Sequence, residues 1–172
     1  MKRIVSLLLA ALLVFSSWTF SLAETVETQY ESTRLFLSRL DKVGIPYAYY
    51  GINENNREVL EIENTNYDLD ITYTISLFFH ENNENADMYV WNLLTYDPSE
   101  DGFFKVLQAC NACNASWNYA KFYADTSDHT VSVDANMIFR GDSAGEVCYE
   151  GLLHLVSVIS KVYEEHFAPL AQ

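Results

Sequence analysis

The sequence of 172 residues is poor in several features on which common enzyme classes rely. It has six glycines and no glycine-rich phosphate loop, so a cradle of backbone amides around a phosphate is hard to build. The metalloprotease motif His-Glu-x-x-His does not occur. The four histidines are spread over a predicted strand, a turn and the last helix, and we expect neither a cofactor nor a metal site. They are His80, His129, His154 and His166.

Apolar sequence of membrane-spanning length is also lacking. Two basic residues precede an apolar run at residues 4–14, which is short for a bilayer-spanning helix, and Ala23 ends a small-x-small cleavage motif. We therefore predict that residues 1–23 are a secretory signal peptide cleaved between Ala23 and Glu24. Residues 24–172 are predicted to form one domain that is secreted or periplasmic, without a stable membrane anchor.

Basic residues are scarce, with ten Lys and Arg against 24 Asp and Glu. The predicted signal peptide removes two of the basic residues, which leaves eight against 24, a net charge of −16. Such a chain repels a phosphate backbone and an anionic membrane surface, so we expect no nucleic-acid partner. A basic partner, a divalent cation and simple solubility are each compatible with this charge, and a solvated acidic surface is the plainest interpretation.

There are only three cysteines, an odd number that weakens a disulfide argument for an exported chain. Cys110 and Cys113 lie on the inner face of a predicted helix, and Cys148 lies on that of the last helix. One disulfide between these helices and three buried thiols are both open interpretations. A redox pair is disfavoured because Cys110-x-x-Cys113 falls near the helix C-terminus, where the helix dipole opposes a thiolate.

What the sequence does contain is clear periodicity. From Phe103 to Trp117, apolar residues recur at helical spacing, including Leu107 and both cysteines. Residues 119–125 and 130–139 then alternate with period two around a polar turn, which predicts an antiparallel hairpin. In this pattern Val133 lies on the buried face and Ser132 on the solvent face.

The remaining segments complete an α+β pattern. Residues 25–43 and 147–167 have helical periodicity, and the first helix ends at Gly44. Residues 58–63, 71–80 and 88–96 are predicted strands, and residues 97–102 are a predicted turn that caps the next helix. The expected fold is an α+β domain with an antiparallel sheet in the order α-βββ-α-ββ-α.

Short motifs add a family resemblance to this order of elements. They are Asn114-Ala115-Ser116, Lys121-Phe122, Asp125, Asp128 and Val131-Ser132-Val133, together with Leu40, Gly44, Tyr47 and the segment from Asp70 to Leu77. With these motifs the chain, over about Thr25 to Phe167, resembles the YbjN family. The resemblance implies a type III secretion chaperone-like fold, a role in regulating sensory transduction, binding of partner segments, homodimerisation and no catalytic residues.

Two functions of different classes follow. The first is an exported, non-enzymatic binding or chaperone-like module with a protein or peptide partner. The alternative is a secreted hydrolase that uses scattered acidic residues, although Glu81, Glu84 and Asp87 are predicted to lie in a polar loop without apolar neighbours. An enzyme should have a hollow in which titratable side chains converge, whereas a binder should expose an apolar patch.

Overall fold

The computed structural model describes residues 27–171, so the predicted cleavage site between Ala23 and Glu24 lies outside the described residues. A six-stranded antiparallel sheet with the order β1-β2-β3-β4-β6-β5 is accompanied by helices, which confirms the α+β class. The elements are α2 (Glu31–Val43), β1 (Ala48–Ile52), β2 (Arg57–Asn66), β3 (Ile71–His80), β4 (Asn85–Thr95), α3 (Glu100–Ser116), β5 (Ala120–Asp125), β6 (Thr130–Ile138), a 3-10 turn (Gly141–Ser143), α4 (Ala144–Val162) and a π-helical turn (Tyr163–Phe167).

The sheet has one strand more before α3 than the sequence pattern predicted. The additional strand is β1, which continues through Gly51, a residue type that often ends a strand. Gly51 has a φ of 78°, a conformation that glycine adopts without a side-chain clash, and the β1–β2 register shifts between Tyr49 and Gly51. The glycine therefore forms a bulge instead of ending the strand, and the observed order is α-ββββ-α-ββ-α.

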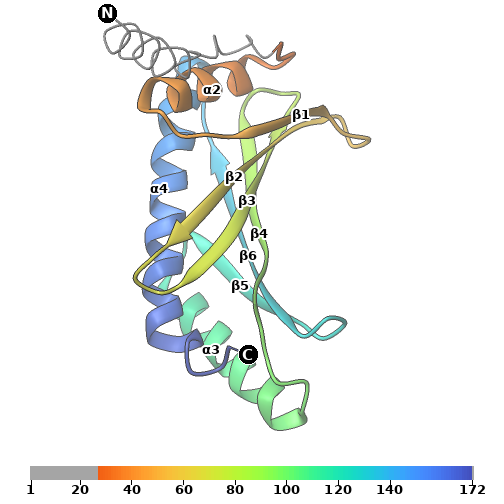
Figure 1. Cartoon of the computed structure of the whole chain (residues 1–172). Helices are drawn as coiled ribbons and strands as arrows, with labels where there is room; N and C mark the ends of the chain where they lie inside the picture. The colour runs from red at the N-terminus through yellow and green to blue at the C-terminus, as the bar shows by residue number, and fades with distance from the viewer. Residues whose placement is uncertain (1–26, 172) are drawn as a thin grey trace, which may run out of the picture.

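One face of the sheet packs against helices. The ring of Phe36 in α2 lies 5.6 Å from that of Phe79 in β3, and Phe122 in β5 lies 5.7 Å from Phe167. Figure 1 shows α4 running along the sheet, with α2 near one end and α3 near the other. The strand register aligns a row of buried apolar residues across this covered face. They are Leu60, Leu77, Met88, Ala135 and Ala120.

The opposite side of the sheet, which we call the open face, stays accessible. Its positions alternate with the buried ones along each strand. Ser132 lies on this side, as the alternation predicts, but the prediction that it is solvated is wrong, because Ser132 is only 3% exposed. Its hydroxyl oxygen accepts a hydrogen bond from the Asn92 N–H at 3.2 Å, so a neighbouring strand covers it.

The first helix starts later than its periodicity predicted. α2 begins at Glu31 rather than at residue 25, and its N-cap residue, Tyr30, makes no capping hydrogen bond through its own side chain. Instead, the fully buried carboxylate of Glu58 in β2 accepts hydrogen bonds from the N–H groups of Gln29 at 2.6 Å and Tyr30 at 3.2 Å. A residue distant in sequence thus fixes where the helix begins.

The predicted cap of α3 is confirmed, since the Ser99 hydroxyl oxygen accepts a hydrogen bond from the Gly102 N–H at 3.1 Å. The predicted inner face is wrong at one position, because Leu107 is exposed and Val106 is buried instead. Near its C-terminus, α3 lies beside β5. There the Asn114 side chain donates to the Phe122 carbonyl and accepts from the Phe122 N–H, both at 2.8 Å, so it pairs the outer backbone groups of an edge strand.

Candidate functional site

Two hollows near the start of β1 contain few groups suited to acid–base catalysis. One, of about 250 Å³, lies between β2 and α4 and is lined mostly by apolar side chains, among them Ile62, Leu152 and Val156. The other, of about 420 Å³, includes Tyr50 and Glu61. The Tyr50 hydroxyl donates to the Glu61 carboxylate at 2.9 Å, so these two groups satisfy each other.

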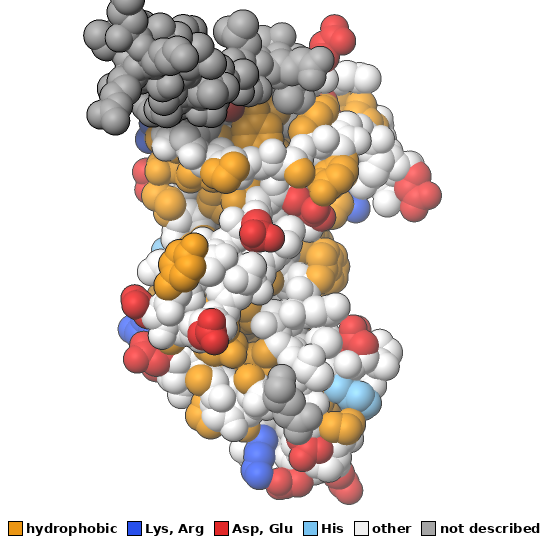
Figure 2. Space-filling model, in the orientation of Figure 1, with side chains coloured by type: hydrophobic (Ala, Val, Ile, Leu, Met, Phe, Trp, Pro, Cys, Tyr) orange, Lys and Arg blue, Asp and Glu red, His pale blue; other side chains and the backbone are white. Residues whose placement is uncertain are grey.

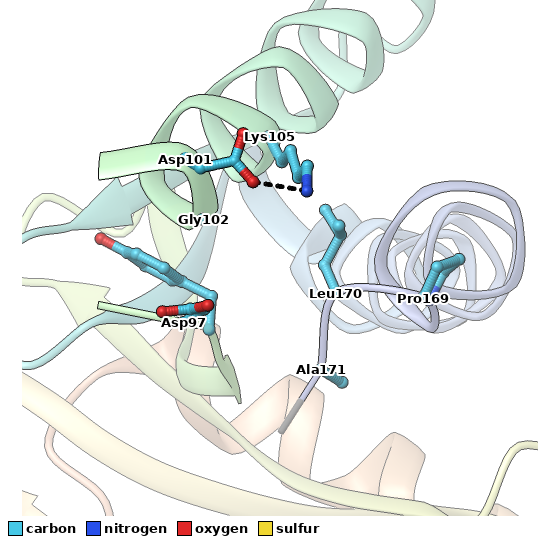
Figure 3. A pocket seen from close by; sticks show the side chains of 8 residues that line it. Asp97, Asp101, Gly102, Lys105, Pro169, Leu170 and Ala171 are labelled. Atoms are coloured by element: carbon cyan, nitrogen blue, oxygen red, sulfur yellow. Dashed lines mark ion pairs between the residues drawn. The ribbon is translucent and has the colours of Figure 1, made fainter. Parts of the chain in front are cut away.

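A third hollow, of about 220 Å³, brings carboxylates near the C-terminal residues (Figure 3). Asp101 forms an ion pair with Lys105 at 2.6 Å. The Ser99 N–H donates to Asp97 at 2.8 Å, and this hydrogen bond holds the pKa of Asp97 below its ordinary value. A general acid needs a raised pKa, so the arrangement at Asp97 is typical of a helix start rather than of acid catalysis.

The structure describes Cys110, Cys113 and Cys148 as buried, free thiols. Burial raises the pKa of Cys110 to about 12, of Cys113 to about 11 and of Cys148 to about 12. Because the thiolate is the reactive form, these pKa values oppose nucleophilic and redox chemistry at neutral pH.

The most distinctive cluster lies on the open face, over the middle of the sheet. The register aligns Phe78 with Asp87 and Asn136, and it aligns Tyr89 with Asp134 and Lys121 in the adjacent row. The prediction that Asp87 lies in a polar loop is therefore wrong: it belongs to β4 and is only partly exposed. The strand begins three residues earlier than its apolar residues indicated.

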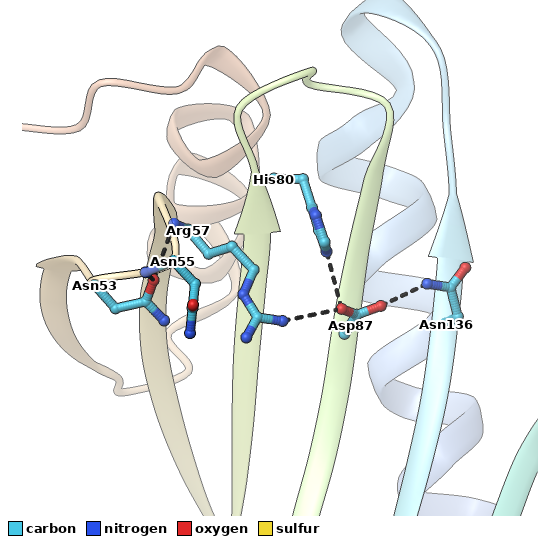
Figure 4. Close-up of polar contacts among 6 residues, drawn as sticks. All are labelled: Asn53, Asn55, Arg57, His80, Asp87 and Asn136. Carbon is cyan, nitrogen blue, oxygen red and sulfur yellow. Dashed lines mark hydrogen bonds and ion pairs between the residues drawn. The ribbon is translucent and has the colours of Figure 1, made fainter.

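Asp87 is the centre of a polar group (Figure 4). The Asn136 amide donates to it at 2.5 Å, His80 Nε2 lies 2.9 Å from its Oδ2, and the Arg57 guanidinium lies 3.4 Å from the same oxygen. Arg57 also lies over the Phe78 ring, 4.8 Å from its centroid. Its own position is fixed by Asn53, whose side-chain oxygen accepts from the Arg57 N–H at 3.0 Å. Asp87 and Arg57 thus satisfy each other.

An aromatic row begins beside this polar group. The Phe78 and Tyr89 rings meet edge to face with centroids 5.5 Å apart, and the Tyr89 and Trp91 rings stack 4.7 Å apart at an interplanar angle of 3°. Trp91 at the end of the row is 51% exposed, and Ile138 on the same face is 77% exposed. Large apolar side chains at such exposure mark a surface suited to binding.

A bulge in β4 sets the position of Trp91. Val90 pairs with Val133 and Leu94 with Val131, so residues 91–93 occupy a length that one residue occupies on β6. Asn92 has a φ of 54°, its N–H donates to Ser132, and its side-chain oxygen accepts from the Thr130 hydroxyl at 2.9 Å. Bulges commonly redirect a side chain. These contacts to β6 hold in place the bulge that contains Trp91.

The aromatic row has an acidic neighbour in Asp134, which pairs with Tyr89 across the strands. Burial, together with the negative charge of Asp87, raises the pKa of Asp134. Burial also raises the pKa of Tyr123, and the charge of Asp134 contributes to this shift, so Tyr123 belongs to the same electrostatic neighbourhood. Asp134 is therefore a carboxylate whose charge the fold does not fully compensate.

Sequence reasoning missed this surface because its residues come from different strands. Trp91 falls within the strand predicted at residues 88–96, and Asp87 falls in the polar loop predicted before it. The Asn-Leu-Leu sequence after Trp91 gives no recognisable bulge motif. One available signal was that an aromatic side chain shares a face with polar residues along β4.

Other properties of the described chain concern its surface. In Figure 2, acidic side chains are spread over the visible face rather than gathered in one patch. Among residues 27–171, no three His, Cys, Asp or Glu side chains form a group that could hold a metal ion. No helix in that range is both long and apolar enough to cross a membrane.

Comparisons with protein-family models and with curated proteins give no match for this chain.

Proposed function

We propose that this protein is an exported, non-enzymatic binding module, chaperone-like in that it holds a segment of a partner protein on the open face of its sheet. The observation that carries the proposal is the position of Trp91. This residue lies in the β4 bulge at the end of the aromatic row, and its side chain is half exposed. Exposed aromatic anchors of this kind dominate the binding energy of protein interfaces.

The resemblance to the YbjN family supports the same class of function, because that family is described in terms of regulating sensory transduction and its fold is associated with partner binding. It also favours homodimerisation. A secreted or periplasmic location follows from the predicted signal peptide, and N-terminal sequencing of the exported protein should begin at Glu24. A retained N-terminus in a membrane fraction would contradict this location.

Binding by the open face can be tested with the processed protein as bait in the exported fraction. Captured proteins are identified by mass spectrometry, and the affinity of a purified candidate is then measured by calorimetry. We expect Trp91→Ala to weaken binding by at least about tenfold. The matched control is Tyr67→Ala, which removes an 88% exposed aromatic side chain from the β2–β3 turn. Equal affinities of the two variants would exclude the open face as the binding surface.

A further inference from the structure

Carboxylates outnumber basic groups on the open face. Arg57 is already paired with Asp87, which leaves Lys121 as the remaining basic side chain among the described positions of this face. The acidic side chains at these positions are Glu61, Glu63, Asp87, Asp125 and Asp134. The aromatic row therefore lies in a negative electrostatic environment.

Aromatic rings and carboxylates together suit a cation. Ammonium and guanidinium groups are attracted to the face of an aromatic ring, most strongly to tryptophan, and a nearby carboxylate adds a charge interaction. One face of the Trp91 ring is stacked on Tyr89, yet about half of the residue remains accessible to a ligand. Asp134 has Lys121 opposite it, but Lys121 is exposed to solvent, and Asp134 is partly exposed and so accessible to a ligand.

The spacing indicates the form of the ligand. Asp134 is the cross-strand partner of Tyr89, and the Trp91 ring stacks on Tyr89 with centroids 4.7 Å apart, so Trp91 and Asp134 both neighbour Tyr89. Alternate side chains of an extended chain lie on the same side, about 6.6 Å apart. An extended segment that crosses Tyr89 therefore presents alternate side chains to Trp91 and to Asp134.

We propose that the open face binds an extended, cationic segment of a partner protein, with one lysine or arginine on the Trp91 ring and another at Asp134. This inference rests on the proposed binding function and names the chemistry of its partner.

The probe is a synthetic peptide with lysine alternating with serine, and the control peptide has glutamine in place of lysine. The processed protein carries Trp117→Phe, so Trp91 is the sole tryptophan among residues 24–172 and its fluorescence reports binding. We expect the lysine peptide alone to bind, and its Kd to rise by at least about tenfold between 0.05 and 0.5 M salt. Equal binding of the glutamine peptide would overturn the proposal.

Variants test the two contacts separately. Asp134→Asn should weaken lysine-peptide binding by about fivefold or more, whereas Asp68→Asn, on the exposed β2–β3 turn, should not change it. Trp91→Ala, measured by calorimetry, should weaken it by about tenfold, and a thermal melt checks that each variant is folded. If Asp134→Asn and Asp68→Asn change the affinity for the lysine peptide equally, binding depends only on the overall negative charge, and the proposal is overturned.

Sedimentation tests whether the open face binds a second copy of the chain instead of a cationic segment. A concentration-dependent dimer that Trp91→Ala dissociates would assign the open face to self-association and overturn the cationic ligand. If a captured partner depends on Trp91 but the lysine peptide does not bind, the proposed function stands and the cationic inference fails. If neither depends on Trp91, both fail.

Discussion

Replacing Glu58 with alanine should destabilise the domain strongly, because this buried carboxylate organises the start of α2. It accepts hydrogen bonds from the N–H groups of Gln29 and Tyr30 and from the Tyr49 hydroxyl at 2.6 Å. Burial, assisted by the hydrogen bond to Glu58, raises the pKa of Tyr49, so the phenol stays protonated as a donor. The negative charge also lies at the positive end of the helix dipole.

The size of the effect follows from the donors left unpaired. Gln29 is exposed and can bond to water, but the Tyr30 N–H is buried and the Tyr49 hydroxyl is partly buried. Each such orphaned group costs about 1–3 kcal/mol, so with two of them Glu58→Ala should lower the free energy of unfolding by about 2–6 kcal/mol. Domains of this size have a total of about 5–15 kcal/mol. Glu58→Gln keeps the shape but places an NH2 group against a donor, and it should cost about 1–3 kcal/mol.

Urea unfolding measures these differences, and Glu63→Ala is the matched control because this exposed glutamate lies on the other face of the same strand. The control should change stability by less than about 0.5 kcal/mol. Hydrogen exchange at the Tyr30 amide should accelerate in Glu58→Ala beyond the change at β6. A Glu58→Ala protein within about 1 kcal/mol of the control would refute the role assigned to this carboxylate.

Other substitutions test the edge strand, the acidic face and the cysteines. Asn114→Ala should lower the free energy of unfolding by about 1–3 kcal/mol, because it leaves the Phe122 backbone groups unpaired. The control Asn118→Ala, at an exposed residue, should leave stability unchanged. Equal melting temperatures of the two variants would contradict the role of Asn114. Asp134→Asn should raise the melting temperature at neutral pH, since a raised carboxyl pKa means stability that is present below the ordinary value near 3.8 and lost as the pH rises through the folded value. The two proteins should converge at acid pH, and a variant less stable at neutral pH would show that the charge is compensated. The three cysteines should alkylate slowly at pH 7 in the folded protein and rapidly in urea, and fast labelling of the native state would contradict their raised pKa values.

Sequence periodicity predicted most of the layer structure because burial on one face repeats every two residues in a strand. The β5–β6 hairpin is the clearest case, with Val131, Val133 and Ala135 all buried. The extra strand was missed because a single glycine can either end a strand or form a bulge, and local sequence does not distinguish the two. The start of α2 was missed for a related reason, since Glu58 determines it from another element.

The candidate site was less predictable than the fold. Asp87 gains its partners from three strands, and these contacts depend on a register that no short segment encodes. The bulge at Trp91 is likewise held by contacts to Ser132 and Thr130 on β6. Alternation placed Ser132 on the correct side of the sheet, but only the three-dimensional contact with Asn92 shows why a polar side chain there is buried.

The pairing of Asn114 with Phe122 has a consequence for how copies of this chain could associate. A sheet with two free edges can add chains at both and grow into a fibre, whereas a sheet with one free edge cannot. Because Asn114 pairs the outer backbone groups of Phe122 in the middle of β5, this edge is obstructed, and strand pairing between copies is directed to the β1 side. Two copies joined there would use up the available edge, so growth by strand addition would stop at a pair.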